Sequence, residues 1–70
     1  MERFEVSFTH DGIYYEGYIK PLDENHPPKV FEVVLNNVFM GNLVYNSAWK
    51  LDLHPELAFI LGDCVLRRWN

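Results

Sequence analysis

The residues of this chain that could take part in acid–base, nucleophilic or metal chemistry are few and widely separated. The three histidines are His10, His26 and His54, and the sequence contains a single cysteine, Cys64. None of them stands at the spacing from another that zinc sites use. His10 precedes Asp11, which could be half of a catalytic pair, but His-Asp-Gly is also the composition of a tight turn. We therefore expect no metal site, no cofactor and no catalytic residue.

Two further features have simpler structural explanations than chemical ones. His54-Pro55-Glu56 has only one of the two histidines of a zincin helix, and a proline suits the first position of a helix. Cys64 falls on an apolar helical stripe, which favours an inert buried thiol over a nucleophile. We expect the protein not to be an enzyme, and a small enzyme that uses His10 or Cys64 is an alternative.

Charge and hydropathy exclude several classes of partner. Six Lys and Arg residues against ten Asp and Glu residues give a formal net charge of −4, and the longest basic run is Arg67-Arg68. A polyanion would be repelled, so we expect no nucleic-acid binding. We also expect no membrane association, because no stretch approaches about 20 apolar residues and the first residues lack a signal-peptide pattern. A single cysteine suits a reducing compartment, so we expect a cytoplasmic protein.

The elements that must position these residues are strands followed by one helix. Apolar and polar residues alternate in the first segment, and later segments are rich in β-branched and aromatic residues. The expected strands are residues 4–9, 13–20, 30–35, 38–45 and a short one around 49–51. Asp11-Gly12 and Asn36-Asn37 suit tight turns between them. Gly41 indicates a bulge or the close approach of another element.

The last part of the chain is expected to form one helix from about residue 55 to 68. Its apolar residues recur at helical spacing and form a stripe centred on Leu57 and Cys64 that would face the core. The chain length allows a single domain, residues 1–70. The fold class is therefore α+β, a four- to five-stranded antiparallel meander with one C-terminal helix packed on one sheet face.

Two surfaces of this fold are more apolar than a solvent-facing surface needs to be. The helix face opposite the stripe carries Phe59 and Leu66 beside Gly62 and Trp69, and a helix that is apolar nearly all round is buried on more than one side. The sheet face away from the helix is expected to carry further apolar residues, among them Tyr14, Tyr18 and Met40, interleaved with polar residues such as Glu16. The predicted interface residues are Phe59, Gly62, Leu66, Trp69, Tyr14, Tyr18 and Met40.

Self-association is the expected way to stabilise so small a core. Natural proteins of this size often add a disulfide, a metal or a second subunit, and this chain has neither the cysteines nor a metal motif. The leading hypothesis is a non-enzymatic protein-interaction or self-associating module, a homodimer or the binder of a protein partner. The alternative is a small-ligand carrier with a pocket between sheet and helix, lined by Tyr15, Phe31, Trp49 and Ile60.

Three further features resemble those of known small proteins: the order of the strands, a tryptophan in the last strand and the helix sequence Glu56-Leu57-x-x-Ile60-Leu61-Gly62. The chain resembles small uncharacterised bacterial proteins with an antiparallel sheet followed by one C-terminal helix. That resemblance implies the fold and no activity.

Overall fold

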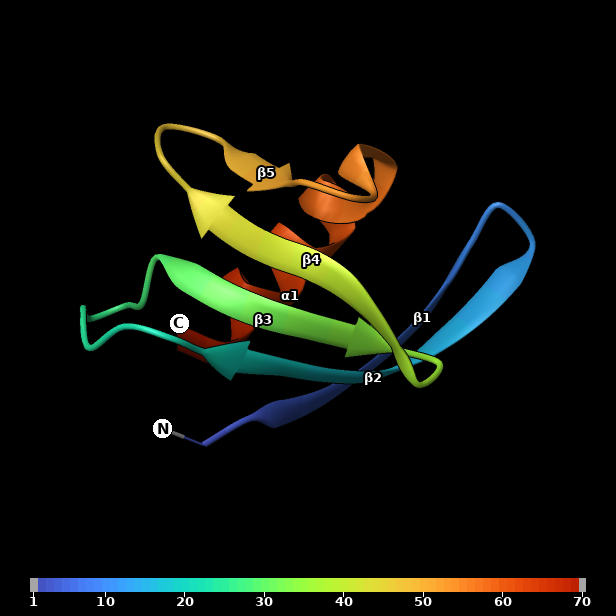
Figure 1. Ribbon diagram of the computed structural model, residues 1–70, viewed down its shortest axis with the longest axis horizontal. Helices are drawn as coiled ribbons and strands as arrows, with labels where there is room; N and C mark the ends of the chain where they lie inside the picture. Colours follow the sequence, from blue (N-terminus) through green and yellow to red (C-terminus); the bar gives the residue numbers. More distant parts are fainter. Residues whose placement is uncertain (1, 70) are drawn as a thin grey trace.

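The computed structural model describes residues 2–69, which form one curled antiparallel sheet followed by a helix (Figure 1). The strands are β1 (Phe4–His10), β2 (Ile13–Pro21), β3 (Val30–Leu35), β4 (Val38–Tyr45) and β5 (Trp49–Leu51), and they lie in the sheet in the same order as in the chain. A 3₁₀ turn, η1 (Pro55–Leu57), leads into the helix α1 (Ala58–Trp69). The predicted α+β meander with one C-terminal helix is confirmed.

The core lies between α1 and one face of the sheet, and Figure 1 shows α1 behind β3 and β4. Phe31 is its largest fully buried side chain, and it packs between two tryptophans. Its ring centroid lies 6.1 Å from that of Trp49 and 5.9 Å from that of Trp69. The fully buried side chains are Ile19, Phe31, Val33, Leu35, Leu43, Leu51, Leu57, Leu61 and Val65. We call the covered side of the sheet the inner face and the opposite side the outer face.

The buried side of α1 differs from the predicted stripe. Leu61 and Val65 are buried as expected, but Gly62 is also buried, whereas Cys64 is only half-buried. The cause is a close contact between Gly62 and Trp49, since a β-carbon at Gly62 would overlap the indole ring. The missing side chain lets the helix roll towards β5, which turns Cys64 partly out of the core. Cys64 therefore packs against the core, but the prediction that it is fully buried there is wrong.

A β-bulge in β4 changes which residues face the core. Val33 pairs with Gly41 and Val34 pairs with Phe39, so Met40 is an extra residue between the two pairs. Gly41 has a φ of 108°, a conformation that glycine adopts without strain. The extra residue shifts the alternation, so Met40 is 5% exposed on the inner face. Its predicted place on the outer face is wrong, and a bulge at Gly41 is confirmed.

The first hairpin extends beyond the rest of the sheet. Asp11 and Gly12 have φ values of 53° and 78°, which fit a type I′ turn between β1 and β2. β2 pairs with β3 only between Gly17 and Pro21, so the first half of β2 has no neighbour on that side. Figure 1 shows the tip of this hairpin projecting away from β3 and β4.

Candidate functional site

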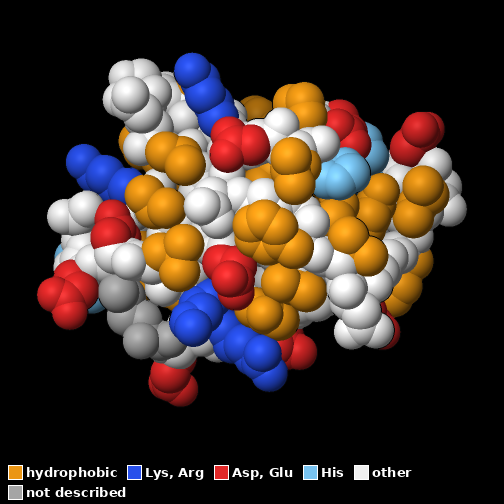
Figure 2. Space-filling view, viewed as in Figure 1, with side chains coloured by type: hydrophobic (Ala, Val, Ile, Leu, Met, Phe, Trp, Pro, Cys, Tyr) orange, Lys and Arg blue, Asp and Glu red, His pale blue; other side chains and the backbone are white. Residues whose placement is uncertain are grey.

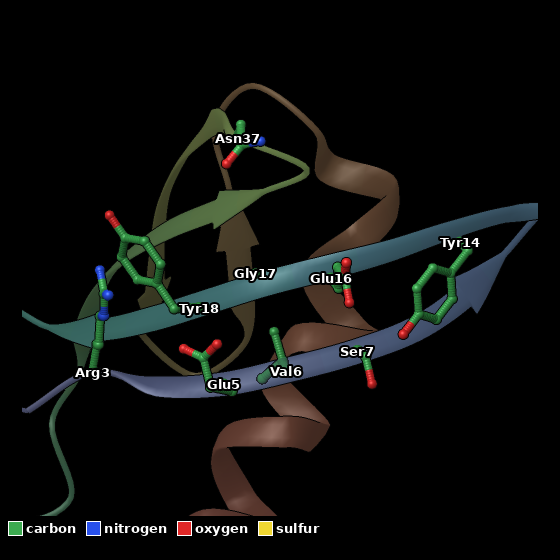
Figure 3. A pocket seen from close by; sticks show the side chains of 9 residues that line it. All are labelled: Arg3, Glu5, Val6, Ser7, Tyr14, Glu16, Gly17, Tyr18 and Asn37. Atoms are coloured by element: carbon green, nitrogen blue, oxygen red, sulfur yellow. The ribbon is translucent and has the colours of Figure 1, made fainter.

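A depression of about 610 Å³ lies on the outer face of the first hairpin. Asn37, from the turn between β3 and β4, is one of its polar lining residues, and the other six are on or next to the first hairpin: Arg3, Glu5, Ser7, Tyr14, Glu16 and Tyr18. Figure 3 shows the two carboxylates between the two tyrosine rings, with the ring of Tyr14 leaning over β1 towards Ser7. We call these six residues the hairpin cup.

The pairing of β1 with β2 places the members of the hairpin cup side by side. Glu5 lies opposite Tyr18 and Ser7 lies opposite Glu16. Side chains directly opposite each other on one face of an antiparallel pair are close enough to interact. Strict alternation along both strands keeps all of these side chains on the outer face.

The electrostatics of the hairpin cup favour a positively charged group. The guanidinium carbon of Arg3 lies 4.4 Å from the centroid of the Tyr18 ring, a cation–π contact within the chain itself. Within residues 2–69, the ion pairs are His54 with Glu56 and Asp63 with Arg67, so Glu5 and Glu16 have no basic partner there. A lysine or arginine from another molecule would meet carboxylates and aromatic faces here.

Asn36, in the turn between β3 and β4, ties the hairpin to the rest of the sheet. Its side-chain oxygen accepts a hydrogen bond from the Glu16 amide at 3.0 Å, and its side-chain nitrogen donates to the Tyr14 carbonyl at 3.1 Å. Its own amide donates to the Glu16 carbonyl at 2.8 Å. These bonds hold β2 at the point where it leaves β3, and they fix the backbone that carries Tyr14 and Glu16.

Asn36→Gly is expected to lower the free energy of unfolding by about 1–2 kcal/mol, because two side-chain hydrogen bonds are lost. Asn37→Gly is the matched control. Both residues have positive φ, 52° and 64°, so glycine fits both positions, but Asn37 makes no side-chain hydrogen bond within the described chain. We expect the control to change stability by less than about 0.5 kcal/mol. Urea denaturation of the two variants measures the difference, and equal values would show that the Asn36 bonds are not formed in solution.

The outer face as a whole carries apolar side chains among its charges (Figure 2). Tyr14 and Phe39 are 57% and 50% exposed, and Val34 and Val44 are half-buried. No helix of the described chain covers this face, because α1 lies on the other side of the sheet. Large half-exposed aromatic residues on an uncovered sheet face are typical of a binding surface.

The predicted interface residues are divided between the surface and the core. Tyr14 and Tyr18 lie on the outer face as expected, and Phe59 and Leu66 are 83% and 47% exposed on α1. Trp69 is half-buried, and its ring lies 5.6 Å from that of Phe4. The helix therefore has a smaller free apolar surface than its sequence indicates, since Trp69 and the buried Gly62 pack within their own chain.

The sequence predictions omit two residues of the outer face, Phe39 and Glu5. Phe39 was missed because the bulge reverses the alternation before Gly41, although the glycine itself was a signal. Glu16 is predicted on this face, and Glu5 lies there with it. Their alternation with apolar residues in two strands joined by a two-residue turn already places them on one face.

The pocket predicted for a carrier, lined by Tyr15, Phe31, Trp49 and Ile60, is filled by the packing of those side chains. Phe31 is fully buried against Trp49, and Tyr15 stacks on Phe8 with ring centroids 5.3 Å apart. A depression near Trp49 and Leu66 has a volume of about 180 Å³. This is below the roughly 300 Å³ from which ligand pockets usually begin.

The residues considered for catalysis lie on separate elements. His10 is at the tip of the first hairpin, His54 precedes η1 and faces Glu56 at 3.5 Å, and Cys64 is on α1. The Cys64 sulfur accepts a hydrogen bond from Arg67 at 3.8 Å. Across residues 2–69, no three His, Cys, Asp or Glu side chains form a group that could hold a metal ion.

Within the described chain, no helix has the length and hydropathy to cross a membrane. Comparisons with known proteins add no relatives to this description. No family model, no curated protein and no solved structure matches the chain.

Proposed function

We propose that this domain is a non-enzymatic protein-interaction module that binds a protein partner through the outer face of its sheet. The observation that carries the proposal is the pair of half-exposed aromatic residues, Tyr14 and Phe39, on a sheet face without a covering helix. Complete burial of such a side chain is worth about 1.5–3 kcal/mol. The two aromatic anchors, with the half-buried Val34 beside Phe39, would form the apolar centre of an interface, with charged residues at its rim.

The charge of the surface indicates the chemistry of the partner. Glu5 and Glu16 lie in the hairpin cup, and the chain as a whole has a formal charge of −4. A basic partner surface would therefore be attracted during the encounter, and a lysine or arginine would fit between the tyrosine rings. A cytoplasmic site of action is part of the proposal, because a single free cysteine is compatible with a reducing compartment.

The proposal is tested with a photo-activated phenylalanine analogue placed at Phe39 in the cells from which the protein comes. We expect irradiation to give one defined covalent adduct, identified by mass spectrometry. Phe59 is the matched control, since it is an exposed aromatic residue on α1 rather than on the sheet. The same analogue at position 59 should give no such adduct. A missing adduct at position 39, or the same adduct from position 59, would contradict binding through the outer face.

A further inference from the structure

The strand β1 forms a free edge of the sheet. In a type I′ hairpin the two residues that flank the turn form two backbone hydrogen bonds with each other. Every second residue of the strands, counted away from the turn, does the same with the residue opposite it. His10 and Ile13 flank this turn, so Phe4, Val6 and Phe8 also direct their backbone groups to β2. The amides and carbonyls of the intervening residues, Glu5, Ser7 and Thr9, point away from β2. No other part of the described chain forms a hydrogen bond with them.

Apart from the charge of Glu5, this edge lacks the features with which proteins usually protect edge strands. Exposed edges are commonly short, or they carry a proline, a lysine or a bulge. β1 has seven residues with neither proline nor lysine, and its pairing with β2 is continuous from Phe4 to His10. The opposite edge, β5, is only three residues long. The sheet therefore offers one long regular strand for pairing with another chain.

We propose that β1 pairs in antiparallel orientation with β1 of a second copy of this chain, about a two-fold axis that passes through Ser7. This goes beyond binding at the outer face, because it uses the backbone of the sheet edge. Ser7 then lies opposite Ser7 of the second copy, and Glu5 lies opposite Thr9. The pairing forms about six backbone hydrogen bonds, two for each of these three opposed pairs.

The charges along β1 select this register among the neighbouring ones. Only residues whose backbone groups point to the edge can exchange hydrogen bonds, so allowed registers differ by a shift of two residues between the two strands. Each such shift moves the two-fold axis by one residue along β1. An axis at Glu5 would place two glutamates opposite each other, and an axis at Phe8 would bring Glu5 towards the turn that carries Asp11. Like charges directly opposite each other are destabilising. The axis at Ser7 instead brings Arg3 of one copy, just before β1, towards the turn that carries Asp11 of the other, where the two charges can form an ion pair. An axis at Val6 separates the like charges but gains no such ion pair.

The space beside β1 accommodates the added strand. A depression of about 320 Å³ lies between the first half of β1 and α1, and Cys64 and Arg67 form its helical side. In the proposed register Phe8 of the second copy lies opposite Val6 on the inner face, next to this depression. Its ring would cover the half-buried Cys64 and the carbon chain of Arg67. An aromatic residue opposite a β-branched residue is one of the favourable cross-strand pairs.

A charge-reversal pair tests both the edge and the register. Ser7→Lys and Ser7→Glu each place two like charges at the two-fold axis, so each variant alone should dissociate at least tenfold more readily than the wild type. An equimolar mixture of the two should recover dimers, because lysine then lies opposite glutamate. Sedimentation velocity measures the masses, and thermal melting checks that each exposed substitution leaves the fold intact. Asn46→Lys and Asn46→Glu, in an exposed turn away from β1, are the matched controls and should leave the dimer unchanged.

Thr9→Lys adds an independent check of the register, since it places a lysine opposite Glu5 of the second copy and should tighten the dimer several-fold. A wild type that stays monomeric at about 1 mM would overturn the proposal, as would a dimer that neither Ser7 variant weakens. The proposal would also be overturned if each single Ser7 variant formed homodimers as stable as the dimers in their mixture. None of these results affects binding through Phe39, which the cross-linking experiment tests separately.

Discussion

Gly17→Ala is expected to unfold the domain, with a loss of about 3 kcal/mol or more in the free energy of unfolding. Gly17 is the first residue of β2 that pairs with β3, and an added β-carbon would overlap the carbonyl oxygen of Val34. It would also lie 2.9 Å from the α-carbon of Leu35. Both obstacles are backbone atoms in the centre of the sheet, so no side-chain rotation relieves them. A domain of this size rarely has more than about 3–5 kcal/mol of stability. Circular dichroism at 25 °C should therefore show the loss of the fold.

Gly12→Ala is the control for this substitution. An alanine β-carbon at Gly12 meets no atom within 4 Å, so only the backbone strain of a φ of 78° opposes it. We expect a cost of roughly 1–2 kcal/mol for a left-handed alanine, and the variant should remain folded. If Gly17→Ala were no more harmful than Gly12→Ala, β2 and β3 would not be as close in solution as they are here.

Leu61→Glu is also expected to unfold the domain, whereas Phe59→Glu should change stability by less than about 0.5 kcal/mol. Leu61 is fully buried, so the variant loses its packing and places a carboxylate in an apolar core. These effects together cost about 4 kcal/mol or more. Phe59 is 83% exposed near the start of α1, where a negative charge is compatible with the helix dipole.

Urea denaturation with fluorescence of the two tryptophans measures both variants under the same conditions. The comparison separates the buried side of α1 from its free side, because the two residues are close in sequence. A folded Leu61→Glu variant, or an unfolded Phe59→Glu variant, would mean that the helix packs on the sheet with a different side. The sedimentation behaviour of Phe59→Glu also tests the predicted role of this residue in self-association. An unchanged mass would remove Phe59 from the interface.

The fold could be predicted from the sequence because its signals are local. Alternation defines β1 and β2, paired asparagines and Asp11-Gly12 define the turns, and Pro55 precedes the helix. All of these features depend on residues close to one another in the chain. Strand boundaries and the position of the helix are therefore predicted well from neighbouring residues alone.

The errors arise where distant residues decide the outcome. The rotation of α1 about its axis depends on the contact between Gly62 and Trp49. The sequence does not reveal that an indole ring occupies the space that a side chain at Gly62 would fill. The bulge in β4 was indicated by Gly41, but its pairing with β3 determines that Met40 is the extra residue. One inserted residue then exchanges the inner and outer sides of the strand, which moved Phe39 onto the candidate binding surface.

The sheet order also has a consequence for the kinetics of folding. Every strand pairs only with its neighbours in the chain, and the longest connection between paired strands is residues 22–29. Closing short loops costs little chain entropy, and proteins dominated by local contacts fold faster than those whose strands must meet across long separations. The meander can therefore form one hairpin at a time, and α1, which covers the inner face, follows the strands in the chain and leaves the ribosome after them. Until it docks, Phe31 and its neighbours are exposed to water, so the period between sheet formation and helix docking is the time of greatest risk of aggregation.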